Sequence, residues 1–264
     1  VLLSLDCLSC YVLRCKMMCK VAVVKLGGSV ITKKNVPETI DFENLTVCVE
    51  ALKKYVEKGR KLVLVLGGGS FGHHAVSKIL NSKNRLEATD SSVVQLSMLK
   101  LATSVLSKLV NENVPAVLHP PHSLCRDGNS SSCNMDLVIR DLSLGLVPVL
   151  FGDVIPSAED GFRVISGDDI AVEAALAVKA DCLIFVTSTS GVLSREGKVL
   201  ELVESLEQVE TLPLQAPDVT GGMIKKVEKA LKASRAVENI RIVGLKYLSA
   251  ALEGLNVGTR VRGK

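Results

Sequence analysis

The sequence feature that most constrains the fold is an unbroken apolar run that ends in three glycines. Residues 62–66 read Leu-Val-Leu-Val-Leu and lead directly into the glycines at 67–69, after which helical character begins at Ala75. A continuous apolar run of this length is typical of a strand buried on both faces of a parallel sheet. A glycine turn between such a strand and a helix brings backbone N–H groups close to an anion. The segment therefore predicts an anion site, with a plain strand-to-helix turn as the alternative interpretation.

Two further glycine turns follow the same plan and carry lysines. Residues 21–26 form a second apolar run, interrupted by Lys25, and end in a pair of glycines. Lysine is rarely buried without a partner, so Lys25 is expected to meet an anion. A third turn, at 221–222, precedes two lysines in a helical segment. None of the three turns has the spacing of a Walker loop or a dinucleotide fingerprint, and together they predict a site for several phosphates.

The alternation of strands and helices along the chain determines the expected fold class. Strands are predicted over 21–26, 61–66, 115–118, 146–150, 182–187 and 240–243. Helices are predicted over 41–58, 74–80 and 89–111, from Ser166 onward and after Gly222. This order predicts an α/β fold, a three-layer αβα sandwich with a largely parallel central sheet. At 264 residues and 47% hydrophobic content, the chain can bury the core of such a domain.

The first twenty residues differ from the rest of the chain. They carry four cysteines, whose spacing could hold a metal, but no clustered histidine or second paired motif supports such a site. Asp6 and the lack of a basic start argue against a secretory signal. We interpret residues 1–20 as a dispensable extension and residues 21–264 as the domain, and we predict no metal site. The four cysteines are Cys7, Cys10, Cys15 and Cys19.

The composition excludes several classes of partner. The net charge is +4 and aromatic residues make up 3% of the chain, with no basic stretch interleaved with aromatics, so nucleic-acid binding is not expected. No apolar run reaches the roughly eighteen residues that a membrane span needs. The other cysteines are scattered, and Cys182 lies in an apolar run as a small hydrophobe. This cysteine usage fits a reducing cytosol.

Four segments carry a resemblance to a known family. In chain order they are 25–29 (Lys-Leu-Gly-Gly-Ser), 67–73 (Gly-Gly-Gly-Ser-Phe-Gly-His), 165–169 (Ile-Ser-Gly-Asp-Asp) and 218–223 (Asp-Val-Thr-Gly-Gly-Met). These segments are similar to the amino acid kinase superfamily and, within it, look most like the isopentenyl phosphate kinases. The resemblance spans residues 21–260, which is nearly the whole chain.

The resemblance implies a function as well as a fold. It implies ATP-dependent phosphorylation of isopentenyl phosphate to isopentenyl diphosphate in isoprenoid biosynthesis, with Mg²⁺ entering together with ATP. It also implies a cytoplasmic homodimer. The N-terminal part of the domain would bind the acceptor and the C-terminal part the nucleotide. Helices between residues 75 and 111 would line the apolar end of the acceptor pocket.

The acceptor in such a reaction sets specific demands on the site. A phosphate monoester is largely a dianion at neutral pH, since its second pKa is about 6, and it needs cations and donors rather than a general base. By the resemblance, His73 donates a hydrogen bond to the acceptor phosphate, and Gly68 and Gly152 present backbone amides to it. A helix-start histidine that faces solvent is the alternative interpretation of His73. His74 lies one residue past the family motif and is the weaker candidate.

The resemblance also implies a set of catalytic residues. Lys25 holds phosphates of ATP, Lys34 stabilises the transition state, and Asp168 fixes the orientation of the lysine ammonium groups. Because Lys33 is adjacent to Lys34, either lysine could be the one that matches the family position. Asp168 could instead cap its helix. The residues implied in nucleotide binding are Lys25, Gly27, Gly28, Gly69, Ser188, Gly221, Gly222 and Lys226. Lys225 is the open alternative to the last of these.

The turn after the strand at 182–187 departs from the family pattern. Relatives typically have Thr-Asp-x-x-Gly-Val there, whereas this chain has Ser188 in place of the aspartate. Because that turn borders the nucleotide, the change bears on ATP affinity. Two alternatives therefore stay open: a superfamily kinase that acts on a phosphonate, nucleotide or carboxylate, and a nucleotide-binding regulator that has lost catalysis. His73 favours an acceptor that is already a phosphate or phosphonate.

Overall fold

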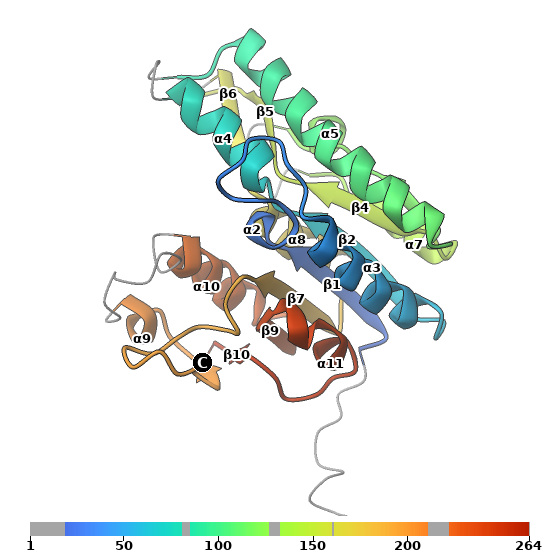
Figure 1. Cartoon of the computed structure of the whole chain (residues 1–264), viewed down its shortest axis with the longest axis vertical. Helices are drawn as coiled ribbons and strands as arrows, with labels where there is room; N and C mark the ends of the chain where they lie inside the picture. Colours follow the sequence, from blue (N-terminus) through green and yellow to red (C-terminus); the bar gives the residue numbers. More distant parts are fainter. Residues whose placement is uncertain (1–18, 81–84, 127–132, 160, 211–221, 264) are drawn as a thin grey trace, which may run out of the picture.

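The apolar runs of the sequence form the strands of a central sheet (Figure 1). The computed structural model describes residues 19–80, 85–126, 133–159, 161–210 and 222–263. Within these residues the sheet has eight strands, in the spatial order β3 (Ala116–Leu118), β4 (Val147–Phe151), β2 (Lys61–Leu66), β1 (Val21–Leu26), β7 (Cys182–Thr187), β9 (Asn239–Gly244), β10 (Thr259–Val261) and β8 (Leu202–Val203). Neighbouring strands pair in parallel, except for the antiparallel pair β9 and β10. The largely parallel α/β fold predicted from the sequence is confirmed.

Helices cover both faces of the sheet and complete three layers. One face is covered by α3 (Phe42–Val56), α5 (Ala88–Asn111) and α11 (Leu248–Leu252), and the other by α7 (Asp136–Ser143), α8 (Gly167–Ala177) and α10 (Gly222–Ala233). A hydrophobic core lies between the sheet and each of these two sets of helices. On β1, Val24 belongs to the core under α3, α5 and α11, and Val23 belongs to the core under α7, α8 and α10. Side chains alternate along a strand, so Lys25 shares its face with Val23 and points toward α8 and α10.

Most predicted elements lie within two residues of their expected ends, but one helix begins earlier and several elements were not predicted. The helix expected over 74–80 begins earlier, as α4 (Gly69–Leu80), because Gly69 takes a positive φ of 49° and turns the chain at once into the helix. The antiparallel hairpin of β5 (Asp153–Ser157) and β6 (Gly161–Ile165) was not predicted, since its apolar pattern is interrupted by charged residues and a proline. The helices α7 and α11 and the strands β8 and β10 were also not predicted, and neither were the short helices α2 (Gly28–Ile31), α6 (Pro121–Leu124), α9 (Glu207–Glu210) and η2 (Leu245–Tyr247).

The parallel strands bring their glycine turns to one edge of the sheet. Gly27, after β1, donates its amide to the Val186 carbonyl of β7 at 2.9 Å. Gly67 and Gly152, after β2 and β4, make the corresponding bonds to the neighbouring strands β1 and β2, at 2.8 and 3.3 Å. Each glycine turn is therefore hydrogen-bonded to the strand beside it. As a result, the three turns lie close together in space although they are far apart in the sequence.

The helix α5 is long and apolar enough, by length and composition alone, to cross a membrane. Its buried stripe packs into the core beside the sheet, through Val94, Met98, Leu101, Val105 and Leu109. These residues recur at spacings of three and four, which is the pattern of a helix with one core-facing side. We therefore describe α5 as a core helix of the domain.

The cysteines differ from the expectation of scattered thiols. Disulfides join Cys19 to Cys182 and Cys125 to Cys133. The interpretation of Cys182 as an isolated small hydrophobe is therefore wrong, because its partner precedes β1 by two residues and could not be identified from spacing. Among the described residues, Cys48 is free and buried. The other three cysteines of the N-terminal cluster lie outside the described residues.

Cys19 and Lys20 pack with the folded body, although the sequence analysis placed them in the extension. The Tyr55 hydroxyl donates to the Cys19 carbonyl oxygen at 2.8 Å. The Asp181 carboxylate accepts hydrogen bonds from the amides of Lys20 and Val21, at 2.9 and 2.8 Å. The proposal of a dispensable extension therefore concerns only the residues that precede Cys19, and these lie outside the described part of the chain.

The contact between Tyr55 and Cys19 gives a stability prediction. Replacing Tyr55 by Phe removes the hydroxyl and leaves the buried Cys19 carbonyl without this donor. We expect the free energy of unfolding in urea to fall by about 1–2 kcal/mol. Tyr247→Phe is the matched control, since the described structure shows no hydrogen bond from the Tyr247 hydroxyl. An equal effect of the two substitutions would contradict the prediction.

Candidate active site

The sheet edge where the glycine turns gather is hollowed by a cavity of about 950 Å³. Its walls come from the turns after β1, β2, β4 and β7 and from the first turns of α8 and α10. The lining also includes Val76, Val94, Met98 and Val164, which come from α4, α5 and β6. In Figure 1, α4 and α5 lie at one end of the molecule and α9 and α10 at the other, with β1 and β2 between them. The cavity therefore has an apolar end on the side that the sequence analysis assigned to the acceptor.

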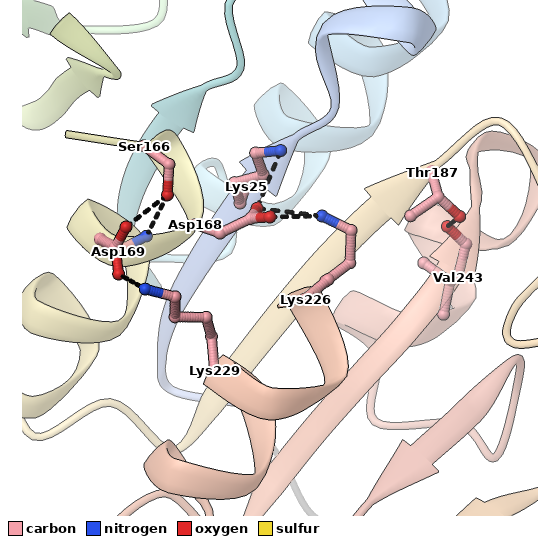
Figure 2. Close-up of polar contacts among 8 residues, drawn as sticks. All are labelled: Lys25, Ser166, Asp168, Asp169, Thr187, Lys226, Lys229 and Val243. Carbon is pink, nitrogen blue, oxygen red and sulfur yellow. Dashed lines mark hydrogen bonds and ion pairs between the residues drawn. The ribbon is translucent and has the colours of Figure 1, made fainter. Parts of the chain in front are cut away.

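At the centre of the cavity, one carboxylate lies between two lysine ammonium groups (Figure 2). The Asp168 carboxylate is 2.9 Å from Lys25 Nζ, and it accepts two hydrogen bonds from Lys226 Nζ at 3.0 and 2.8 Å. Lys25 and Lys226 are only 7% and 8% exposed. With two cations and one anion, this cluster carries one uncompensated positive charge, which suits it to bind an anion.

The charges of the cluster are set by burial and by one another. Burial alone would raise the pKa of Asp168, but Lys25 and Lys226 hold it well below its usual range, so the carboxylate is ionised. Burial and the charge of Lys25 lower the pKa of Lys226 to about 8, although Asp168 opposes this shift. Lys226 therefore titrates close to physiological pH.

Local structure explains why Asp168 lies where it does. Ser166 is the N-cap of α8 and its hydroxyl oxygen accepts from the Asp169 amide at 3.1 Å, while the Ser166 hydroxyl donates to the Asp169 carboxylate at 2.6 Å. This reciprocal cap fixes the first turn of α8, which carries Asp168. Asp168 itself does not cap the helix, so the capping alternative is wrong.

A second ion pair lies beside the first and was missed by the sequence analysis. Lys229 of α10 bonds to the Asp169 carboxylate, as Figure 2 shows. Lys229 follows Lys226 by three residues on the same helix, so both side chains lie on the α8 side of α10. The three-residue spacing of Lys226 and Lys229 could have indicated a second lysine at this site, but it could not identify Asp169 as the partner of Lys229.

The first two glycine turns touch each other so closely that neither admits a side chain. A Cβ atom on Gly28 would lie 2.0 Å from the Gly69 nitrogen. A Cβ atom on Gly69 would lie 2.2 Å from Thr32 Oγ1. These positions therefore require glycine for a steric reason, and the cavity wall between β1 and β2 consists of backbone.

The structure brings most of the predicted site residues to this cavity. Besides the central cluster, its lining includes Gly27, Gly28, Lys34, Gly68, Gly69, Gly152, Ser188 and Gly222. Lys225 is exposed whereas Lys226 is buried and paired, which favours Lys226 of the two candidates. The His73 side chain and Gly221 lie outside the described part of the structure. His74, the weaker histidine candidate, also lines the cavity.

Comparison with known proteins gives a consistent result. Residues 20–244 match the amino acid kinase family. The chain is 34% identical over 248 residues to an isopentenyl phosphate kinase of Haloferax volcanii, which covers 92% of this chain and 98% of the relative. It is 33% identical to one of Methanothermobacter thermautotrophicus, with 92% and 99% covered. An X-ray structure of isopentenyl phosphate kinase superposes with a TM-score of 0.78 at 26% identity, covering 91% and 99% of the two chains.

The electrostatics of the central cluster give a prediction about proton binding. The ammonium group of Lys226 is expected to titrate with a midpoint near pH 8. NMR of ¹³C-labelled lysine measures this midpoint. The Lys226 signal is assigned by its absence from the spectrum of Lys226→Gln. Asp168→Asn removes the partner that raises this pKa, so the midpoint should move to lower pH. An unchanged midpoint in Asp168→Asn would contradict the assigned contact.

The same shift predicts how Lys226 affects stability. The pKa of Lys226 in the folded protein, about 8, lies below its ordinary value of 10.5. Between these two pH values the unfolded chain binds more protons than the folded one, so the contribution of Lys226 to stability rises with pH across this window. The burial of its charge is thus most costly below pH 8.

Proposed function

The chain belongs to the isopentenyl phosphate kinases of the amino acid kinase family, and from this we propose that it transfers the terminal phosphoryl group of ATP to isopentenyl phosphate. The product is isopentenyl diphosphate. The observation that carries the proposal is one cavity with a positively charged cluster at its centre and apolar residues at one end. That combination suits a substrate with a phosphate head and a short hydrocarbon tail.

The main barrier in such a transfer is the approach of two anions. Two unit charges 4 Å apart repel by about 4 kcal/mol at an intermediate dielectric constant. The ammonium groups of Lys25 and Lys226 neutralise this repulsion, and Asp168 holds them in fixed positions. The acceptor phosphate is itself the nucleophile, so the site needs alignment and charge rather than a general base.

The proposal assigns the two halves of the domain to the two substrates. Gly68, His73 and Gly152 bind the acceptor phosphate, and the helices α4 and α5 bind its hydrocarbon tail. Lys34 stabilises the transition state from the loop after β1. The nucleotide lies on the β7 and α10 side, against Lys25, Gly27, Gly28, Gly69, Ser188, Gly221, Gly222 and Lys226. Support for this division comes from the shared cavity and from the apolar lining on the α4 and α5 side.

Magnesium is expected to enter with ATP rather than to occupy a protein site. The described residues hold no group of three or more histidine, cysteine or carboxylate side chains that could bind a metal. Mg²⁺ is commonly held by nucleotide phosphates and waters with one or two carboxylates, so the charged cavity is compatible with it. Its chemical contribution would be to neutralise the charge of the ATP phosphates.

The proposal includes a cytoplasmic homodimer. On α5, the apolar side chains Val93, Leu96 and Val110 are 57%, 57% and 51% exposed, and a second copy of the chain could cover them. A cytoplasmic location agrees with the use of ATP. Of the two disulfides, the one between Cys19 and Cys182 is compatible with that location because both cysteines are fully buried, whereas Cys133 of the other is half-buried.

The function is tested with purified protein, ATP, Mg²⁺ and a panel of acceptors followed by ³¹P NMR. The panel contains isopentenyl phosphate, a phosphonate, a nucleoside monophosphate and N-acetylglutamate. We expect a diphosphate signal with isopentenyl phosphate at a much higher rate than with any other acceptor. Transfer to a carboxylate or nucleotide instead would identify a different kinase, and ATP binding without any transfer would favour a regulator.

Adjacent lysines on α10 provide a matched pair of variants. Lys226→Gln should lower kcat by about 10²-fold or more, because it removes a charge that neutralises the transferring phosphoryl group. Lys225→Gln should lower kcat much less, by about 3-fold, since Lys225 lines the cavity but is exposed and its substitution leaves the buried cluster intact. Steady-state kinetics measure both, and similar losses in the two variants would contradict the choice of Lys226.

The serine-containing turn after β7 gives a prediction about the nucleotide. A carboxylate there can bind donors or magnesium-bound water, whereas Ser188 offers a neutral hydroxyl. Ser188→Asp should therefore change the KM for ATP more than the KM for isopentenyl phosphate. Kinetics in which each substrate is varied in turn measure both constants. A change confined to isopentenyl phosphate would mean that this turn belongs to the acceptor side.

A further inference from the structure

A buried hydroxyl joins the two glycine turns that lie against each other in one wall of the cavity. Thr32 Oγ1 donates a hydrogen bond to the Gly28 carbonyl at 2.8 Å and accepts one from the Ser70 amide at 2.9 Å. Thr32 follows the turn after β1 and the short helix α2, while Ser70 is the second residue of α4, directly after the turn that follows β2. Thr32 is only 3% exposed, so water does not compete for these bonds.

Besides Thr32, the two turns are held by the hydrogen bond of the Gly67 amide to the Leu26 carbonyl and by the close contact of Gly28 with Gly69. Their glycines lack side chains, so packing between them is limited to backbone contact, and glycine backbone loses more freedom on ordering than other residues. Thr32 Oγ1 also occupies the space into which a Cβ atom on Gly69 would project, at 2.2 Å. The hydroxyl therefore fills the space between the turns and bonds to both of them.

The same residue anchors the loop that carries Lys34. Thr32 begins this loop and forms an isolated antiparallel bridge with Ile40 at its other end. Within the loop, the Thr39 carbonyl accepts from the Ser70 hydroxyl at 3.3 Å, and the Glu38 amide donates to the Ser70 carbonyl at 3.2 Å. A displacement of Thr32 relative to Ser70 would thus move the Lys34 loop together with both glycine turns.

We propose that Thr32 is a positioning residue for phosphoryl transfer, whose hydroxyl fixes the separation of the two glycine turns and the placement of Lys34. This inference rests on the proposed kinase function. In that function the turn after β1 and Gly69 contact the donor phosphates, whereas Gly68 of the turn after β2 contacts the acceptor phosphate. The relative position of the two turns then determines how the two reacting phosphates are aligned, and catalysis is sensitive to displacements of about 1 Å.

The test uses two substitutions that separate the hydroxyl from the rest of the side chain. Thr32→Val keeps the shape and removes the hydrogen bonds, and it should lower kcat by about 10²-fold with smaller changes in both KM values. Thr32→Ser keeps the hydroxyl and should retain kcat within about 5-fold of wild type. A loss confined to kcat is expected because each turn still binds its own phosphate while the alignment between them is lost.

Thr46→Val is the matched control. Thr46 also donates to a carbonyl four residues earlier, that of Phe42 at 2.8 Å, but it lies on the exposed side of α3. Its variant should keep wild-type kinetics. The thermal unfolding midpoint of every variant is measured alongside kcat, so that a general loss of folded protein is distinguished from misalignment. Should Thr32→Val fail to fold, Thr32→Cys, with its weaker and longer hydrogen bonds, should show an intermediate kcat.

Several results would overturn the proposal. One is a near-normal kcat in folded Thr32→Val, or in Thr32→Cys where that variant is used instead. Another is an equal loss of kcat in Thr32→Ser and Thr32→Val. A loss that appears only in the two KM values would also overturn it. If wild-type protein phosphorylates a different acceptor, the proposed substrate is wrong, and the same comparison is made with that acceptor.

Discussion

The buried carboxylate of Asp168 between two lysines is the interaction on which the rest of the site depends. Two ammonium groups this close and this buried would repel each other, and one would lose its proton without a shared anion. Asp168 compensates one of the two charges and leaves the other uncompensated. The burial of that remaining charge is unfavourable in the empty protein, so part of the free energy of binding a phosphate comes from its compensation. The uncompensated positive charge therefore both destabilises the cluster and favours the binding of phosphate.

The parallel sheet makes this cluster possible by bringing separate strand ends to one edge. Lys25 reaches the cluster because strand alternation directs it to the face covered by α8 and α10. The helix α8 can approach that face because its first residue is Gly167, where a Cβ atom would lie 2.8 Å from the Leu66 carbonyl oxygen. A larger residue at that position would push away the turn that carries Asp168. The geometry of the charged cluster therefore depends on the absence of a side chain at Gly167, the residue before Asp168.

The parts of this site that could be predicted from the sequence are those with a local signal. Lys25 interrupts an apolar run, and a glycine turn follows at once, so its contact with an anionic group could be predicted from a few residues, although not that the group is Asp168. Lys225 and Lys226 could not be separated in this way, because only tertiary packing buries one and exposes the other. The pair of Asp169 and Lys229 and the disulfide of Cys19 join residues 60 and 163 positions apart, with no local pattern to mark the partner. The hairpin of β5 and β6 escaped prediction because its charged residues and proline obscure the strand pattern.

The contacts of the empty cluster also constrain how substrates leave. Asp168 and a bound phosphate compete for the same ammonium hydrogens of Lys25 and Lys226, since each lysine has three donors and both are directed at the carboxylate. In the proposed reaction, bound phosphates would take some of these donors, and Asp168 would regain them when the products leave. Without this carboxylate one of the two lysines would lose its proton, so Asp168 keeps both of them charged while it competes for their hydrogens. The carboxylate therefore limits how tightly the site holds anions, as a site that must release two charged products in every cycle requires.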